Sequence, residues 1–262
     1  MKLELFYVLL VSTAAWAGSI DADTVMDRVK WRNDGDSRMA EVTLQIMDGD
    51  GDVRERSIDY VEKDVGKKRY TILYVKKPKD VRRTTILMKN DSTHEHGTKS
   101  DIWLYLPVLG KSKKLSSQNK SGNFVGSDFR YSDLEWIVLE DFIYTLKGKE
   151  KVHGRQTYKI EAAAANDDVI EKTGYSKKIL WVDPEYNLIV RADFYDKQGF
   201  YEKRLDVEDV EKIDGYWTVV RQKIENFIDD RQTEMRLSNI AYNKPVPDRL
   251  FRKQKLGKKI TW

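Results

Sequence analysis

Three short polar motifs contain residue types that could do chemistry. His94-Glu95-His96 would place two imidazoles on one face of a strand, as a zinc site needs, but a third protein ligand is not evident. Residues 48–52 read DGDGD, yet Val53 and Asp59 stand where a calcium loop needs glycine and glutamate. No G-x-S-x-G motif of a serine nucleophile occurs, and Gly126-Ser127-Asp128 has no suitably spaced histidine to act as its base. We therefore expect no catalytic residue, no metal and no cofactor, and we expect that the chain is not an enzyme.

Aromatic residues are concentrated in residues 101–134 of a chain that has 7 Trp, 14 Tyr and 8 Phe. An apolar strand at residues 102–106 stops at Pro107 and is followed by a loop rich in Gly, Ser and Lys. Because both faces of this strand are apolar, we expect it to be covered on both sides, or covered on one and lining a cavity on the other. The residues predicted to line or gate that cavity are Trp103, Leu104, Tyr105, Leu106, Phe124, Phe129, Tyr131 and Leu134.

The remaining sequence predicts an antiparallel meander with few helices. Strict alternation over residues 40–46 is typical of a half-buried strand, and Asp214-Gly215 is a strong hairpin signal. Helical patterns are confined to residues 21–30, which Asp21 or Asp23 could cap, to residues 131–139, and to residues 161–165, which could also be strand. We expect a mainly β (α+β) fold, with one strongly curved sheet or partly open barrel whose apolar face is covered by helices.

The N-terminus predicts export from the cytoplasm. Residues 1–17 combine Lys2, an apolar run and an Ala15-Trp16-Ala17 cleavage motif, as a secretory signal peptide does. The apolar run is far shorter than the ~20 residues that a membrane span needs. The chain has no cysteine, so it has neither a disulfide nor a lipid-anchor cysteine after the signal. We expect a soluble, monomeric periplasmic protein with one domain over residues 18–262.

The charged residues allow an anionic lipid or an acidic protein as a partner, whereas nucleic acid is not expected. The formal net charge is +4, and 34% of the residues are charged, which indicates a well-solvated surface. Basic residues cluster within 76–83, 111–114 and 252–259, where they could serve anionic lipid head groups or an acidic partner, or simply face solvent. Nucleic acid is not expected as a ligand, because no recognition motif occurs and export would separate the two.

The central segment resembles a known family. Residues 101–107 read DIWLYLP, residues 111–117 follow, and residues 121–129 read SGNFVGSDF before Tyr131, Asp133 and Leu134. Together with residues 247–251, reading PDRLF, and the early helical pattern, this sequence is similar to outer-membrane lipoprotein-sorting proteins of the LolA-like superfamily. The similarity is strongest to the branch associated with RND-type exporters, and it covers essentially the whole expected mature chain.

This resemblance implies a half-open β-barrel around a hydrophobic cavity, with helices as a lid. It further implies a periplasmic carrier that binds the acyl chains of a lipoprotein or phospholipid and moves them toward an outer-membrane acceptor. An inner-membrane exporter or lipoprotein-release complex would be the donor. Carriers of this family use a strand arginine that bonds to the lid, and Arg69, Arg82, Arg83 and Arg130 all remain open as its counterpart.

Residues 131–139 are our hypothesis for the lid helix. Ser132 or Asp133 would cap it, its apolar side chains would share one face, and Gly122 and Gly126 would serve as its hinge. An alternative function is a non-carrying adaptor or sensor that docks to an RND-type envelope exporter. A carrier needs an apolar hollow on the inner face, whereas an adaptor could be filled with side chains.

Overall fold

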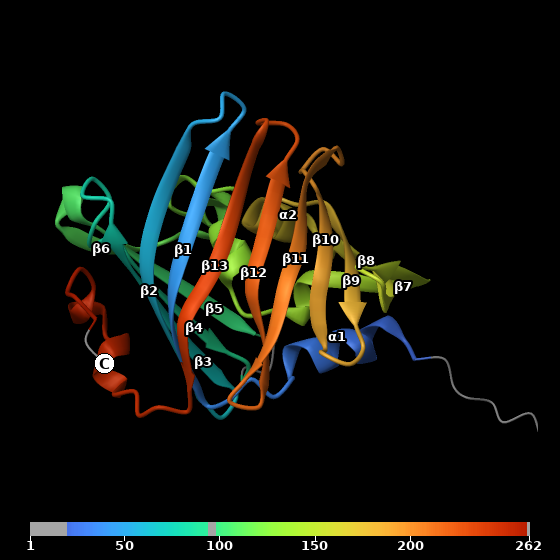
Figure 1. Cartoon of the computed structure of the whole chain (residues 1–262), viewed down its shortest axis with the longest axis horizontal. Coiled ribbons are helices and arrows are strands. Elements are labelled where there is room, and N and C mark those ends of the chain that lie inside the picture. The colour runs from blue at the N-terminus through green and yellow to red at the C-terminus, as the bar shows by residue number, and fades with distance from the viewer. Residues whose placement is uncertain (1–19, 94–97, 261–262) are drawn as a thin grey trace, which may run out of the picture.

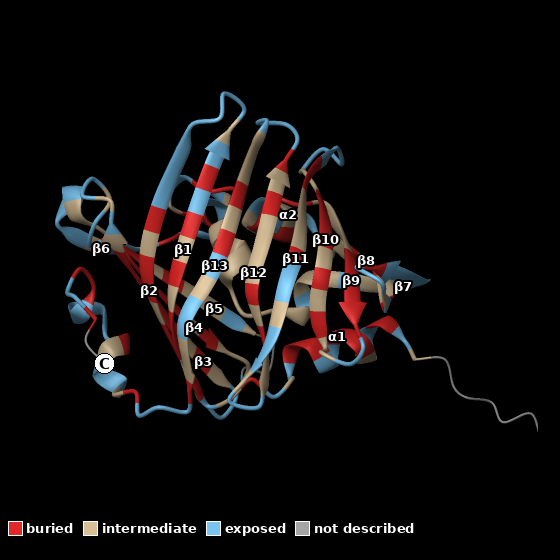
Figure 2. Ribbon diagram, in the orientation of Figure 1, coloured by how far each residue is buried: buried red, intermediate tan, exposed pale blue. Residues whose placement is uncertain are grey.

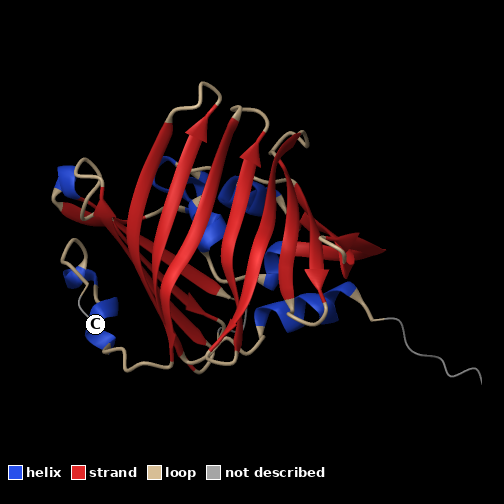
Figure 3. Cartoon of the chain, in the orientation of Figure 1, coloured by secondary structure: helices blue, strands red, loops and turns tan. Residues whose placement is uncertain are grey.

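The computed structural model describes residues 20–93 and 98–260, so the expected signal peptide and His94-Glu95-His96 lie outside the described residues. The described residues form one antiparallel sheet of 13 strands and two α-helices, together with short 3-10 turns (Figures 1 and 3). The sheet is strongly curved but does not close. The predicted mainly β class with few helices is therefore confirmed.

The strands are, in chain order, β1 (Ser37–Asp48), β2 (Val53–Val65), β3 (Lys68–Lys77), β4 (Thr85–Asp91), β5 (Lys99–Leu106), β6 (Lys111–Lys114), β7 (Phe142–Val152), β8 (Arg155–Ala164), β9 (Lys177–Asp183), β10 (Leu188–Tyr195), β11 (Tyr201–Ile213), β12 (Tyr216–Asn226) and β13 (Arg231–Tyr242). The helices are α1 (Ala22–Lys30) and α2 (Asp167–Thr173).

The first and last strands meet in the middle of the sheet. The spatial order is β6-β5-β4-β3-β2-β1-β13-β12-β11-β10-β9-β8-β7, so the sheet is two meanders joined through β1 and β13. Val42 of β1 lies opposite Ile58 on one side and Leu237 on the other. The two edge strands, β6 and β7, are not paired with each other within the described residues. Both are rich in lysine, which discourages pairing with another chain.

Local sequence accounts for both helices. The Asp21 carboxylate accepts a hydrogen bond from the Thr24 amide at 2.6 Å and caps α1, which confirms the helix predicted over residues 21–30. Asn166 caps α2 in the same way, and Gly174 ends it with a φ of +81° that favours glycine. This second helix was not predicted, and residues 161–165, where a helix was considered, form the end of β8 instead.

The helix predicted over residues 131–139 is wrong. A single 3-10 turn spans Tyr131–Leu134, and the chain is extended at Glu135, with φ −72° and ψ 151°. The Asp133 carboxylate accepts a hydrogen bond from the Arg130 amide and so stabilises the turn. The Glu135 carboxylate is ion-paired with Lys120 at 2.6 Å, which holds the following chain in an extended path instead of a helix. Tertiary contacts therefore override the helical pattern in this segment.

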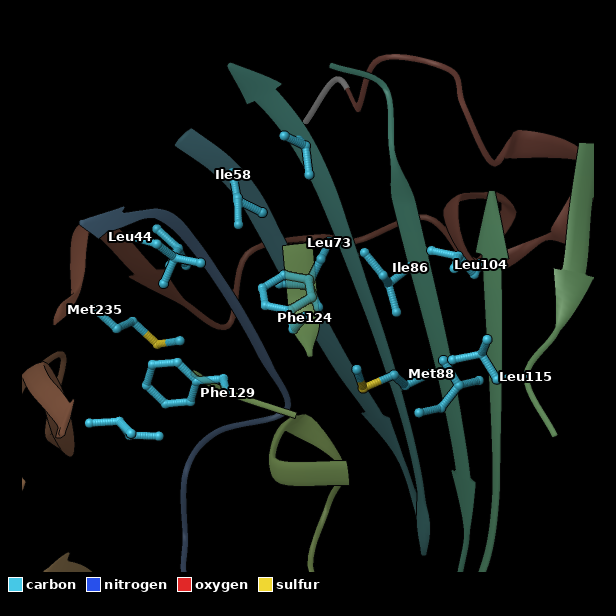
Figure 4. Close-up of a cluster of buried hydrophobic side chains, with 14 residues drawn as sticks. Leu44, Ile58, Leu73, Ile86, Met88, Leu104, Leu115, Phe124, Phe129 and Met235 are labelled. Atoms are coloured by element: carbon cyan, nitrogen blue, oxygen red, sulfur yellow. The ribbon is translucent and has the colours of Figure 1, made fainter. Parts of the chain in front are cut away.

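Residues 115–141, which connect β6 to β7, run across one face of the sheet, here called the inner face (behind the strands in Figure 1). Their Phe124 and Phe129 side chains are buried among inner-face residues of β1–β5 and β13, as Figure 4 shows. The opposite, outer face of β2–β5 packs against residues 246–260, including Phe251 and Leu256. Strand β5 is thus covered on both sides, the first of the two arrangements expected from its apolar faces.

Burial follows this two-sided covering. Figure 2 shows buried residues gathered in the body of the sheet, whereas the hairpin turns at its upper rim are exposed. A second inner-face cluster surrounds α1, with Met26, Tyr175 and Leu180 at its centre. The free space of the inner face lies beside this cluster.

Candidate functional site

A pocket of about 260 Å³ lies on the inner face, between residues 132–138 and the strands β7–β12. Helix α1 contributes Met26 to its wall. Most of the remaining wall is apolar, from Phe129, Leu134, Ile137, Val138, Phe142, Leu180, Ile189, Ala192, Phe194 and Leu205. The pocket therefore suits an apolar ligand, with a few polar groups, chiefly Asp133, Lys178 and Gln222, to orient it.

Asp133 anchors the segment that forms one side of this pocket. Its carboxylate accepts hydrogen bonds from the Tyr175 hydroxyl at 2.9 Å and from the Lys203 ammonium at 3.1 Å. Burial alone would raise the pKa of Asp133, but the ammonium groups of Lys203 and Lys178 bring that pKa below its ordinary value of 3.8. Asp133 is therefore ionised at neutral pH and holds the turn against β11.

Arg130 makes a second anchor at the start of the same turn. Its guanidinium donates to both carboxylate oxygens of Glu202, at 2.8 and 2.9 Å, and to the Gly174 carbonyl at 2.8 Å. It also lies over the Tyr175 ring, 4.3 Å from the ring centre. Both bonds to Glu202 come from one nitrogen, Nη2, and hydrogen bonds between charged groups are stronger than those between neutral ones. Arg130 fixes the segment to both α2 and β11.

Asp128 makes the third anchor and is almost fully buried. Its carboxylate accepts from the Thr233 hydroxyl and from Arg231, both at 2.7 Å, and its carbonyl accepts from Lys203 at 2.6 Å. The Gly126-Ser127-Asp128 motif thus serves to attach the segment to β11 and β13. The Ser127 hydroxyl donates to the Phe124 carbonyl and is fully buried, which suits a structural role.

Trp136 divides the pocket from a second hollow. That hollow, of about 280 Å³, has a polar wall containing Arg38, Glu62 and Arg69. Residues 134–137, together with Ile189, line both spaces. The segment is therefore a partition, and its displacement would join two hollows into one.

Arg69 connects a strand to the segment beside the pocket. It lies on β3, and its guanidinium is 4.8 Å from the centre of the Trp136 ring. Arg130 belongs to the segment itself, whereas Arg82 and Arg83 lie in the connection from β3 to β4. Arg83 donates to the Gly257 carbonyl at 2.9 Å, on the outer face. Among these four, Arg69 is the strand residue that contacts the segment beside the pocket.

The eight residues predicted for the cavity lie on two faces of the sheet. Six of them pack in one inner-face cluster: Leu104, Leu106, Phe124, Phe129, Tyr131 and Leu134. Of these, Phe129 and Leu134 reach the wall of the 260 Å³ pocket. Trp103 and Tyr105 point to the outer face, because side chains alternate along β5, and they pack under the C-terminal segment. The Lys253 ammonium lies 3.3 Å from the centre of the Trp103 ring.

The pocket residues that sequence reasoning missed come mainly from β8–β11. Lys178 and Leu180 share the inner face of β9, and Ala192 and Phe194 share that of β10. A signal was present, since Lys178 interrupts the apolar face that Leu180 and Val182 continue. Lys178 could be recognised as a pocket residue only once the structure showed that this face of β9 is the inner one.

Within residues 20–93 and 98–260, no group of three or more His, Asp or Glu side chains is arranged to hold a metal ion. The DGDGD motif forms the turn between β1 and β2, with the Gly51 amide donating to the Asp48 carbonyl at 2.9 Å.

None of the helices in residues 20–93 and 98–260 is long and apolar enough to cross a membrane.

Comparison with known proteins identifies similar sequences and structures. A family model described as an uncharacterized protein matches residues 67–258. The chain is similar to a DUF1329 family protein from Desulfovibrio piger, with 28% identity, a TM-score of 0.81, and coverage of 89% of this chain and 97% of that chain. No curated protein matches the sequence.

Two further solved structures share the fold. A domain from Vibrio parahaemolyticus, described as an outer membrane lipoprotein-sorting protein, has 24% identity and a TM-score of 0.81, covering 90% of this chain and 98% of that one. A LolA superfamily protein from Nitrosomonas europaea has 20% identity and a TM-score of 0.70, covering 91% of this chain and all (100%) of that one. Both similarities cover at least 90% of this chain.

Proposed function

This chain belongs to the family of uncharacterized proteins whose model matches residues 67–258, and from that premise we propose that it is a periplasmic carrier of the LolA-like, outer-membrane lipoprotein-sorting type. It binds the acyl chains of a lipoprotein or lipid in the inner-face pocket, without catalysis, and moves them toward the outer membrane. Export through the signal peptide at residues 1–17, and one carrier domain over residues 18–262, are part of this proposal.

The observation that carries the proposal is the partition between the two hollows. A pocket of about 260 Å³ is smaller than the several hundred cubic ångströms of a ligand site that encloses its ligand. Residues 134–137 separate it from the second hollow of about 280 Å³. If these residues swing outward, the joined space is large enough for an acyl chain. Residues 131–138 therefore act as the lid, although they are not an α-helix.

The energetics of carriage agree with such a lid. Each buried methylene contributes ~0.8 kcal/mol, so a chain of about 14 carbons would gain roughly 10 kcal/mol on binding. A carrier must release its cargo, and a lid that packs well when the pocket is empty offsets much of this gain. The contacts of Trp136 and the anchors at Asp133 and Arg130 provide that packing.

The first test is mass spectrometry of lipids extracted from protein purified from the periplasm without detergent. We expect a stoichiometric phospholipid or acylated peptide. An empty protein, under conditions that detect cargo in a known carrier, would contradict carriage. It would favour the adaptor function instead, in which the protein docks to an envelope exporter.

The second test locks the lid in its closed position. The Ser132 hydroxyl donates to the Thr173 carbonyl at 3.2 Å, so these two residues are in contact, and a cysteine at each, with disulfide formation verified by mass spectrometry, would tether the lid to α2. The chain has no cysteine of its own, so the pair is unique. Lipid exchange should stop in the oxidised form and return on reduction of the same protein. Unchanged exchange in the oxidised form would contradict the lid.

A further inference from the structure

We infer that Lys178 binds the anionic group of the cargo, and that the cargo is an amphiphile with an acyl chain and a single negatively charged head group. This inference rests on the proposed carrier function and narrows its ligand class. A lipoprotein whose acyl chains end in ester and amide linkages would not use Lys178 in this way. A fatty acid or a lipid phosphate would.

Lys178 lies in the middle of an otherwise apolar stretch of the pocket wall. In the register of the sheet it is flanked by Ala162 of β8 and Phe194 of β10, and both of these residues line the pocket with it. The next residue in the same cross-strand row is Lys203 of β11, opposite Phe194. Two lysines thus stand on one row of the inner face, one on each side of a phenyl ring.

The two lysines differ in what they bind. The Lys203 ammonium donates to the Asp128 carbonyl at 2.6 Å and to the Asp133 carboxylate at 3.1 Å, so it is neutralised by the lid segment. No hydrogen bond or ion pair joins Lys178 to any residue that the structure describes. Its ammonium instead lies near aromatic rings, 4.7 Å from the centre of Phe142 and 4.9 Å from that of Tyr175.

The carboxylates of the pocket wall are already paired with other residues. Asp133 is bonded to Tyr175 and Lys203, as described above. Glu135 is ion-paired with Lys120 at 2.6 Å, and Asp141 with Lys172 at 2.5 Å. Lys178 is therefore the cation of the pocket wall that has no carboxylate in direct contact among the described residues, and the anionic group of a ligand would supply that contact.

The electrostatics of Lys178 point in the same direction. Burial lowers the pKa of Lys178, the carboxylates of Asp133 and Asp141 partly oppose this, and the positive charges of Lys203 and Arg130 add to it. Loss of hydration makes a charged Lys178 unfavourable in this apolar wall. An anion that binds beside the ammonium would offset that penalty. The surrounding wall, with Met26, Leu180, Ala192 and Leu205, is suited to the acyl chain of the same ligand.

The test measures the affinity of the delipidated full chain for three single-chain probes: palmitate, palmitoyl lysophosphatidic acid and the neutral monopalmitoylglycerol. Wild-type protein should prefer the two anionic probes. Lys178→Met should weaken binding of both by about tenfold or more, as expected for loss of a charge-assisted hydrogen bond, and should leave the neutral probe within about twofold. Lys178→Arg should retain the preference.

Lys177→Met is the matched control. Lys177 is the preceding residue on β9, its side chain lies on the other face, and its ammonium is 4.4 Å from the centre of the Tyr195 ring. This substitution removes the same charge from the same strand without touching the pocket. It should leave all three affinities unchanged.

Each outcome tests either the role of Lys178 or the proposed carrier function. If wild-type protein binds all three probes equally, and Lys178→Met changes nothing, the role of Lys178 is overturned and carriage stands. If Lys178→Met weakens all three probes equally, Lys178 shapes the pocket and does not select an anion. If no probe binds, the proposed carrier function itself is overturned. The wild-type preference is measured without any variant, so poor folding of Lys178→Met would not remove the test.

Discussion

The guanidinium of Arg69 lies over the ring of Trp136, 4.8 Å from the ring centre, and so connects strand β3 directly to the lid segment. Arg69 is itself held by the carboxylates of Asp34 and Asp64, at 2.8 and 2.7 Å. Trp136 also packs edge-on against Trp31 of the α1 end, with ring centres 5.0 Å apart, and its indole donates to the Lys30 carbonyl. The Trp136 indole is therefore held by contacts with Arg69, Trp31 and the Lys30 carbonyl. Because Arg69 is itself ion-paired, it gives the closed lid a fixed contact site on β3.

Replacing Trp136 should open the lid more often. Trp136→Leu keeps an apolar side chain but removes the cation–π contact, which contributes about 0.5–2 kcal/mol, and the edge-on contact with Trp31. We expect acyl-chain dissociation to be several-fold faster, measured by displacement of a fluorescent fatty acid. Trp217→Leu, on the outer-face cluster, is the control and should not change this rate. Equal rates in all three proteins would show that Trp136 does not hold the lid.

Breaking the Arg130–Glu202 pair should destabilise the fold. Arg130→Met leaves the largely buried Glu202 carboxylate without its ion-pair partner, and loss of one member of a buried pair costs about 3–5 kcal/mol. Urea unfolding should show this loss. The double substitution Arg130→Met with Glu202→Gln should recover part of it, because the uncompensated charge is removed. A double variant as unstable as the single one would contradict this explanation.

Asp133 should make the stability of the protein dependent on acid pH. Its folded pKa lies below the ordinary value of 3.8, so the ionised carboxylate contributes stability that is present above that value. The contribution is lost as the pH falls through the lower, folded pKa. We expect Asp133→Asn to be less stable than wild type at about pH 6, and the difference in unfolding free energy to shrink toward about pH 2.5. A difference that stays constant over this range would exclude the carboxylate as its source.

Filling the pocket should reduce lipid binding without unfolding the protein. Ala192 of β10 is buried and lines the pocket, so Ala192→Phe would place a ring in the empty space. We expect at least a tenfold loss of affinity for a fatty-acid probe and a melting temperature close to that of wild type. Ile143→Phe, at a position that is 62% exposed, is the control of equal bulk and should bind normally. Unchanged binding by Ala192→Phe would place the acyl chain elsewhere.

The sequence predicted the class of fold because its signals are local. Alternation over residues 40–46 and the Asp214-Gly215 turn depend on neighbouring residues, and both occur in the structure as part of β1 and as the β11–β12 turn. The capped helix at residues 21–30 belongs to the same class of signal, since Asp21 and Thr24 are three residues apart. The apolar residues on both faces of β5 left two arrangements open, a strand covered on both sides or one that lines a cavity, and the structure has the first.

The tertiary structure decided what local patterns could not. Residues 131–139 have a helical pattern, but the ion pairs of Glu135 with Lys120 and of Asp133 with Lys203 hold them in another conformation. The ion pair of the preceding Arg130 with Glu202 acts in the same way. The outer-face position of Trp103 and Tyr105 depends on where residues 246–260 pack, which no local pattern encodes. Lys178 is one lysine among many in the sequence. It becomes a binding candidate because curvature of the sheet encloses it beside apolar residues from other strands, while its neighbours' charges are already paired.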